Sequence, residues 1–339
     1  MAIRKSAVEG MVKNNFWEGK RVLVTGATGM VGSWLVKELI SRRALVVGLI
    51  LDHDLQSELY RSGDIGRIHS VDGKLEDFSC IDRAINQYEI DTVFHLGAQT
   101  IVGSAYRSPL ATFESNIRGS YHVLEACRLG HRLVKRVVVA SSDKAYGEQK
   151  KLPYLEHMPL EGRFPYEVSK SCTDLLAQSY ARSYDLPVAI MRCGNIYGGG
   201  DLNWSRIVPG AIRAFLKDET FVIRSDGKYI RDYVFVRNVC DVYLRLAQAM
   251  DSKQVRGEAF NYSAEERLTV MQVVKAIEGV MGKKKRPVKI LNNAPGEIPS
   301  QYLSSDKIRR VLNYKEHTSL ADGLKQTVEW YREFFAQQP

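Results

Sequence analysis

Hydrophobic runs recur over the first 190 residues of the chain, separated by segments long enough to hold a helix. Six of these runs are rich in Val, Ile and Leu: Arg21–Thr25, Ala44–Leu51, Arg67–Val71, Thr92–Leu96, Arg136–Ser141 and Pro187–Arg192. Short, continuous apolar runs are typical of strands that are buried on both faces of a sheet. Between them apolar residues follow a helical spacing, as at Val31, Leu35 and Leu39. The alternation predicts a doubly wound α/β fold with a parallel sheet.

A glycine-rich turn joins the first predicted strand to the first predicted helix. The backbone of such a turn can approach a pyrophosphate, and the helix N-terminus offers N–H groups and a favourable dipole. A tight structural turn is the alternative, but the position inside the first strand–turn–helix unit favours a dinucleotide site in a Rossmann-type fold. The turn residues expected to contact the cofactor are Gly26, Thr28, Gly29, Met30 and Gly32.

The pattern of predicted secondary structure changes after the sixth run. There Gly198–Asp201 is followed by segments that predict short helices and interrupted strands. We expect an NAD(P)-binding Rossmann domain over residues 1–190 and a smaller, mostly substrate-binding C-terminal lobe over residues 191–339. Residues 231–262 are expected to return to the main sheet.

The choice between NAD and NADP depends on the end of the second strand, where an acidic residue accepts hydrogen bonds from the adenosine ribose. Ile50 is apolar at the expected position, and Asp52 follows two residues later. Asp52 is therefore the predicted ribose contact. NAD is favoured, and NADP stays the alternative.

Tyr166 and Lys170 lie four residues apart, which places them on one face of a helix. Such a lysine is expected to lower the pKa of the phenol, by its charge and through ribose hydroxyls that it holds, so that tyrosinate can take a substrate proton. The spacing alone is weak evidence, because the chain has 17 tyrosines. The position after a strand that ends in Ser141-Ser142, downstream of the glycine turn, makes both residues candidate catalytic groups.

The Gly-x-x-Gly-x-x-Gly turn and the Tyr-x-x-x-Lys pair resemble those of the extended short-chain dehydrogenases/reductases. The resemblance implies a nicotinamide cofactor and a nucleotide-activated sugar as substrate. Phe94–Gln99 resembles the family's fourth-strand motif, which implies cofactor contacts at Leu96 and Ala98, and we place Leu75 among these contacts. Lys74 departs from the family, which usually has an Asp near the adenine.

Two polar residues of this region have a structural and a chemical interpretation. His95 is predicted to be a packed histidine at the end of its strand rather than a chemical group. Asn116 resembles the family's helix Asn that stabilises the site, and we expect a structural rather than a catalytic role.

Ser142, Asp143 and Lys144 follow the fifth strand. In sugar 4-epimerases of this family the two positions after the Ser are non-ionisable, whereas nucleotide-sugar 4,6-dehydratases carry an acid and a base there. The resemblance implies oxidation at C4, loss of water across C5 and C6, and return of hydride to C6, with Ser142 bonded to the C4 oxygen. Asp143 is then the candidate acid, and Lys144 the candidate base if its pKa is depressed. A surface ion pair in a loop is the alternative.

Three residues are expected to bind the substrate. Asn195 lies in a turn that resembles the family's pyrophosphate-binding or sugar-binding turn, and Arg231 resembles the family's diphosphate-binding Arg. Arg206 could contribute similarly, with an ordinary salt bridge as its alternative.

Within the 4,6-dehydratases the chain most resembles the cytidine-diphosphate-glucose enzymes, at Phe16–Lys20, Ser142–Tyr146 and Gly198–Asp201. CDP-glucose is therefore the favoured nucleotide hexose, although the resemblance weakens at Ile230–Tyr233. An NDP-sugar epimerase or reductase on the same scaffold is the alternative. A catalytically silent sugar-nucleotide or NAD sensor is a third hypothesis, and intact Tyr166 and Lys170 argue against it.

The net charge of +9 raises the question of nucleic acid, but Lys283–Arg286 is the only tight basic run, and no base-reading motif accompanies it. We expect no nucleic-acid partner. The five widely spaced cysteines contain no metal-type pair, which favours free thiols, no metal site and a cytoplasmic location. No apolar segment approaches the length of a membrane span.

The oligomeric state is inferred from resemblance alone. Helices expected at Ser108–Leu129 and Tyr166–Tyr184 resemble the pair that forms a four-helix dimer interface in this family. A homodimer or a dimer of dimers is expected, although burial within one chain produces the same amphipathic pattern.

Overall fold

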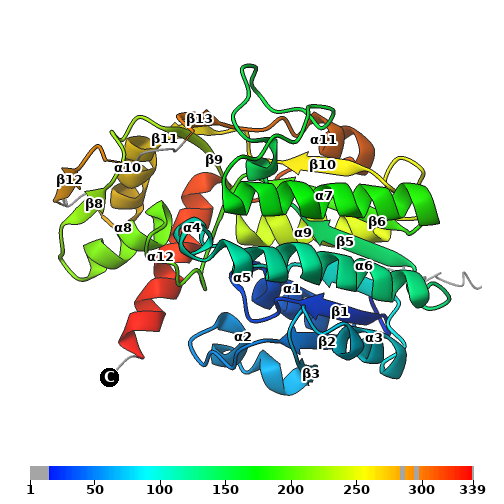
Figure 1. The fold of residues 1–339 in the computed structure, drawn as a ribbon. Helices are drawn as coiled ribbons and strands as arrows, with labels where there is room; N and C mark the ends of the chain where they lie inside the picture. The colour runs from blue at the N-terminus through cyan, green and yellow to red at the C-terminus, as the bar shows by residue number, and fades with distance from the viewer. Residues whose placement is uncertain (1–14, 283–286, 294–297, 338–339) are drawn as a thin grey trace, which may run out of the picture.

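The computed structural model describes residues 15–282, 287–293 and 298–337, so the basic run at Lys283–Arg286 lies outside the described residues. A parallel sheet of seven strands, in the order β10-β6-β5-β4-β1-β2-β3, forms its centre (Figure 1). Its strands are β1 (Arg21–Thr25), β2 (Leu45–Ile50), β3 (His69–Asp72), β4 (Thr92–His95), β5 (Arg136–Ala140), β6 (Val188–Cys193) and β10 (Ala259–Tyr262). The predicted doubly wound α/β fold is confirmed.

Helices cover both faces of the sheet, because successive strand residues point to opposite sides and each side is apolar. Leu23 belongs to a core beneath α3 (Phe78–Gln87), α6 (Gly119–Leu129) and α7 (Pro165–Tyr184). Its neighbours Val22 and Val24 belong to the opposite core, beneath α1 (Met30–Ser41) and α9 (Val236–Gln248). The second core continues into the C-terminal part of the chain.

The helix expected at Ser108–Leu129 is interrupted in the structure. It is divided into α5 (Pro109–Phe113), a π-helical turn η2 (Glu114–Arg118) and α6, and α4 (Val102–Arg107) precedes it. The hydroxyls of Ser120 and Thr173 both donate to the carbonyl of Asn116, at 2.5 and 2.9 Å. Side chains inserted into a helical hydrogen-bond ladder favour such an interruption.

A smaller sheet lies in the C-terminal lobe around β9 (Ile230–Phe235). The strands that pair with β9 are β7 (Asn195–Tyr197), β11 (Arg267–Thr269) and β13 (Ser300–Gln301). A separate pair joins β8 (Phe221–Ile223) to β12 (Val288–Ile290). Residues 231–262 therefore contribute β9 to the smaller sheet and β10 to the large one.

The remaining elements cover the lobe and the connections. They are α2 (Glu58–Arg61), η1 (Asp64–Arg67), η3 (Asp143–Tyr146), α8 (Ile207–Leu216), α10 (Val270–Val280), α11 (Asp306–Leu312) and α12 (Leu320–Ala336). None of the helices in the described ranges is long and apolar enough to cross a membrane.

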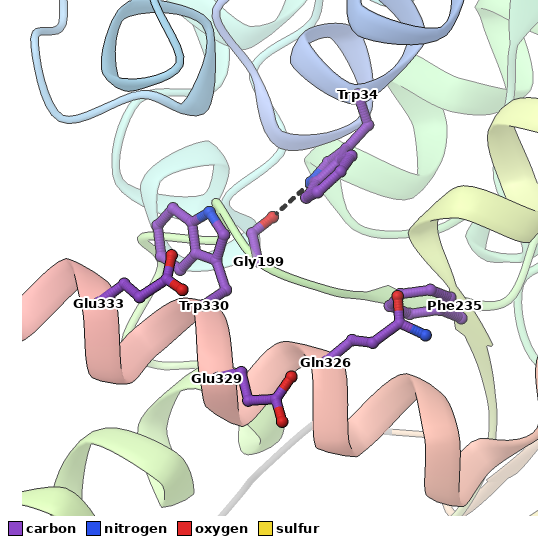
Figure 2. A pocket seen from close by; sticks show the side chains of 7 residues that line it. All are labelled: Trp34, Gly199, Phe235, Gln326, Glu329, Trp330 and Glu333. Atoms are coloured by element: carbon purple, nitrogen blue, oxygen red, sulfur yellow. Dashed lines mark hydrogen bonds between the residues drawn. The ribbon is translucent and has the colours of Figure 1, made fainter.

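The last helix, α12, joins the lobe to the first helices of the chain. A cavity of about 200 Å³ lies at this junction, between α12, the turn after β7 and Trp34 of α1. Figure 2 shows the residues that line it. The indole of Trp34 donates to the carbonyl of Gly199 at 2.8 Å, and the indole of Trp330 donates to Glu58 at 2.7 Å. None of the residues predicted to form the active site lines this cavity.

Candidate active site

The glycine turn lies where the strand order reverses, between β1 and β4. Gly26 has a φ of +69°, and a Cβ added there would lie 2.8 Å from the nitrogen of Gly97. A Cβ at Gly32 would lie 2.0 Å from the carbonyl oxygen of Gly26. The close approach of two backbones thus requires glycine at both positions.

The same turn leaves the N-terminus of α1 suited to an anion. Gly29 is the N-cap residue, no side chain of the described structure caps the helix, and its first turn contains no acidic residue. First-turn N–H groups and the helix dipole stabilise phosphate at such a position. Because ligands bind outside the carboxyl ends of strands at this kind of switch point, the turn fits the pyrophosphate of a dinucleotide.

The other predicted cofactor residues lie along the same edge of the sheet. Leu75 is buried, and a Cβ added at Gly97 would lie 3.1 Å from its side chain. Leu96 and Ala98 are half-buried directly after β4, and Asp52 is exposed two residues beyond β2. Thr28 and Met30 are half-buried at the start of α1.

A buried polar network supports the end of β4. His95 is hydrogen-bonded to Thr25 at 2.9 Å and to Ser120 at 3.0 Å. Burial, together with the smaller effect of the charge of Lys170, lowers the pKa of His95 to about 3, so the ring is neutral. The prediction of a packed histidine is confirmed.

Asn116 connects the loop after β4 to α7. Its side chain accepts a hydrogen bond from the Gln99 amide at 2.7 Å and donates to the Gln99 carbonyl at 3.0 Å. It also donates to the hydroxyl of Ser169, at 2.9 Å. Asn116 therefore has the structural role that the sequence predicts, and its bond to Ser169 reaches the helix that carries Tyr166 and Lys170.

Tyr166 and Lys170 both lie on α7, at the carboxyl end of β5. Lys170 is 4% exposed, and its ammonium donates to the carbonyl of Ala140 at 2.8 Å. Burial lowers the pKa of Lys170 to about 8, against the opposing charge of Asp174. The amine is therefore close to its titration point near neutral pH.

The effect of Lys170 on the pKa of Tyr166, expected from its charge and through ribose hydroxyls, stays a prediction. Burial raises the pKa of Tyr166 to about 12, and the charge of Asp143 raises it too. Arg206 and a hydrogen bond with Ser142 oppose that rise, whereas the Lys170 ammonium is directed at a backbone carbonyl. The structure thus couples the phenol to a cation of the C-terminal lobe.

Asp143 begins the short helix η3, with Ser142 as its N-cap residue. The Ser142 hydroxyl donates to Asp143 at 3.0 Å and accepts from the amide of Lys144 at 3.1 Å. Asp143 is 4% exposed, and burial raises the pKa of its carboxyl above the ordinary value, although Lys144, Ser142 and Arg231 lower it. The alternative of a surface ion pair is therefore wrong for Asp143.

Lys144 is half-buried and extends toward the C-terminal lobe. Its Nζ donates to Oε1 of Gln301 at 2.5 Å, and Nε2 of Gln301 donates to the Asp143 carbonyl at 3.1 Å. Sequence analysis missed Gln301, because a single amide in a two-residue strand carries no signal of its own.

The three predicted substrate residues come from the lobe and its connection. Arg206 forms a salt bridge with Asp201 at 3.0 Å and acts on the pKa of Tyr166, so it lies at the site. Arg231 is 7% exposed, donates to the carbonyls of Ile230 and Pro299, and lies near enough to Asp143 to lower its pKa. Asn195 is half-buried on β7.

Proteins of known activity resemble this chain over nearly its whole length. A CDP-glucose 4,6-dehydratase of Salmonella typhimurium is 30% identical, over 95% of this chain and 93% of the relative. A dTDP-glucose 4,6-dehydratase of Neisseria gonorrhoeae is 29% identical, over 93% of this chain and 96% of the relative. A UDP-glucose 4-epimerase of Mycoplasma pneumoniae is 26% identical, over 93% and 97%.

Solved structures show the same fold. The UDP-glucose 4-epimerase of Thermotoga maritima has a TM-score of 0.83 and 29% identity, covering 93% of this chain and 99% of its own. The dTDP-glucose 4,6-dehydratase DesIV of Streptomyces venezuelae, solved with NAD, has a TM-score of 0.82 and 28% identity, covering 92% and 97%.

The family model described as the NAD dependent epimerase/dehydratase family matches residues 22–262. This match includes the glycine turn, η3 and α7, and it confirms the predicted NAD cofactor at the level of the family. The chain belongs to the NAD dependent epimerase/dehydratase family.

Proposed function

We propose that the protein is a nucleotide-sugar 4,6-dehydratase that converts an NDP-hexose, with CDP-glucose favoured, to the NDP-4-keto-6-deoxyhexose. The observation that carries the proposal is the burial of Asp143 next to Lys144, beside Ser142 and Tyr166. A 4-epimerase needs only hydride transfer at C4 and has no use for a second acid and base.

The first half of the reaction is oxidation at C4. Tyr166, as tyrosinate, takes the proton of the C4 hydroxyl, and Ser142 donates a hydrogen bond to the same oxygen. When bound, NAD would supply the acceptor of hydride from C4 and the donor of hydride to C6. Lys170 would hold the cofactor's ribose, and the turn from Gly26 to Gly32 its pyrophosphate.

The second half is the loss of water. The C4 ketone acidifies the C5 hydrogen, so Lys144, as a neutral amine, takes this proton while the bond from C6 to its oxygen breaks. Asp143 gives its proton to the departing oxygen, which leaves as water; burial favours the protonated acid that this step needs. When C6 receives hydride, Lys144 returns a proton to C5. Tyr166 releases to solvent the proton that it took from the C4 hydroxyl, and the carboxylate of Asp143 takes one up, so both groups are restored.

The lobe provides the substrate contacts in this proposal. Asn195, Arg206 and Arg231 lie on or beside its strands and helices, and guanidinium groups suit a diphosphate. We propose that residues 1–190 form the cofactor domain, with β10 added to its sheet, and that residues 191–339 form most of the substrate lobe.

A panel of nucleotide hexoses tests the activity. CDP-, dTDP-, UDP- and GDP-glucose are each incubated with the enzyme and NAD, and products are followed by alkaline absorbance and mass spectrometry. The expected product has lost the mass of one water, with no net change in NADH. A product of unchanged mass would contradict the dehydratase and support the epimerase, and net consumption of NADH would support the reductase.

We further propose a cytoplasmic homodimer or dimer of dimers. All five cysteines are free thiols, as in a reducing compartment, which supports the cytoplasmic location.

Large apolar side chains support the dimer. They are exposed on α4, α5, α6 and α7, which contact one another: Tyr106, Leu110, Leu129, Leu175 and Tyr184. Light scattering of wild type and Leu175→Glu tests the dimer, which the variant is expected to weaken.

A further inference from the structure

Gln301 is brought to the Asp143–Lys144 pair by the smaller sheet. It lies on β13, where it pairs in parallel with Arg231 of β9, and its side chain is 0% exposed. In sequence it is 157 residues from Lys144. The lobe thus contributes a side chain to the pair that follows β5.

The orientation of this amide is fixed by its surroundings. Its NH₂ group donates to the carbonyl of Asp143 at 3.1 Å, so its oxygen must face the other way, toward Lys144. The oxygen accepts from Nζ of Lys144 at 2.5 Å. A flipped amide would place an NH₂ group against the ammonium, and two donors would then meet without an acceptor.

We infer that Gln301 is a positioning residue for Lys144, holding its amine in the orientation that the C5 proton transfer requires. The inference rests on the proposed function. A neutral amine has two N–H groups and one lone pair, so a hydrogen bond from one N–H to Gln301 restricts where the lone pair can point. A base that is already held in the reactive orientation reacts faster, because no conformational freedom has to be lost before the proton transfer.

Gln301→Leu removes both hydrogen bonds with little change in volume. Elimination should slow by about tenfold or more, while oxidation at C4 should change by less than about threefold. Oxidised sugar and reduced nicotinamide should therefore build up during turnover, which stopped-flow absorbance of the reduced cofactor detects. Ser300→Ala, on the opposite face of the same strand, is the matched control and should show no build-up.

Gln301→Glu keeps an acceptor at the same place and adds a charge. A carboxylate there stabilises the ammonium form of Lys144, so the rising limb of the pH profile for elimination should move to higher pH. A residue that served only to pack β13 would leave this profile unchanged. Gln301→Glu also keeps the inference testable if Gln301→Leu fails to fold.

A double-mutant cycle gives the sharpest result. In a protein that already carries Lys144→Met, adding Gln301→Leu should lower the elimination rate by less than about twofold, because the amine that Gln301 positions is absent. Full additivity, equal losses of oxidation and elimination, or an unshifted pH profile would each overturn the positioning role. Failure of the proposed function looks different, because wild type itself would then form no dehydrated product.

Discussion

The glycine turn and the Asp143–Lys144 pair lie at the same edge of one sheet but are built differently. The turn is a run of consecutive residues whose geometry comes from the backbone, as the close approach of Gly26 and Gly32 shows. The pair depends on side chains from η3, α7, β9 and β13, and its contact with Gln301 spans 158 residues from Asp143. Changes in the turn should therefore affect cofactor binding and stability, whereas changes around the pair should affect one chemical step.

The largest effect is expected at the pair. Asp143→Asn keeps the shape of the side chain but removes the proton that the leaving oxygen needs, so elimination should fall by about 10²–10⁴-fold. Oxidation at C4 should persist, because Tyr166 and Ser142 are untouched. Rapid-quench mass spectrometry of oxidised and dehydrated sugar measures both steps.

The matched control for this change is Asp82→Asn, a half-buried carboxylate on α3 whose partner is Asn86. It should leave both steps unchanged. If Asp143→Asn still lost water at the wild-type rate, the pair would have no part in elimination, and the epimerase alternative would gain.

The lowered pKa of Lys170 should make the free energy of unfolding depend on pH. Its pKa falls from 10.5 to about 8 on folding, so between these values the unfolded chain binds more protons than the folded one. The free energy of unfolding should then rise with pH, by about 3 kcal/mol between about pH 7 and pH 10.5 relative to Lys170→Met. Urea denaturation of both proteins at several pH values measures the difference, and parallel curves would contradict it.

The buried central strands of the large sheet could be predicted because each is fixed by its own residues, whereas the edge strand β10 has no counterpart among the six predicted runs. Runs such as Val22–Val24 and Val137–Val139 are buried on both faces, and burial of that kind leaves a continuous apolar signature. The glycine turn was predictable for the same reason, since its geometry depends on residues within it.

The contacts around the pair could not be predicted, because they depend on how the lobe packs against the sheet. The sequence near Gln301 does not indicate that its side chain accepts a hydrogen bond from Lys144. The sequence near Asp201 likewise does not indicate its salt bridge with Arg206. The influence of Arg206 on the pKa of Tyr166 could not be predicted either, because the two residues are 40 positions apart in the sequence.

In the turn, Gly32→Ala should destabilise the protein by about 1–3 kcal/mol, because the added Cβ would overlap the carbonyl of Gly26. NAD should no longer raise the melting temperature, since the turn must shift to admit the methyl group. Gly279→Ala is the matched control: its added Cβ meets nothing within 4 Å, and it should stabilise α10 by about 0.5–1 kcal/mol. Equal melting temperatures for the two variants would show that the turn tolerates a side chain.

The smallest effect is expected from Arg206, the lobe's cation at the phenol. Arg206→Gln removes a charge that lowers the pKa of Tyr166, so less tyrosinate forms and C4 oxidation at neutral pH should slow by about two- to fivefold. The side chain is 38% exposed, so the loss should shrink at high salt as ions screen the wild-type charge.

The control for Arg206 is Arg309→Gln, a similarly exposed arginine of α11 whose partners are Glu265 and Asp306. It should leave the oxidation rate and its salt dependence as in wild type. Arg206→Lys keeps the charge and should recover most of the oxidation rate. If Arg206 served only to form a salt bridge with Asp201, the pH profile of oxidation would be the same in Arg206→Gln, Arg206→Lys and Arg309→Gln. A shift of the pH profile of oxidation in Arg206→Gln alone would show that the charge of Arg206, which comes from the C-terminal lobe, acts on the phenol of Tyr166.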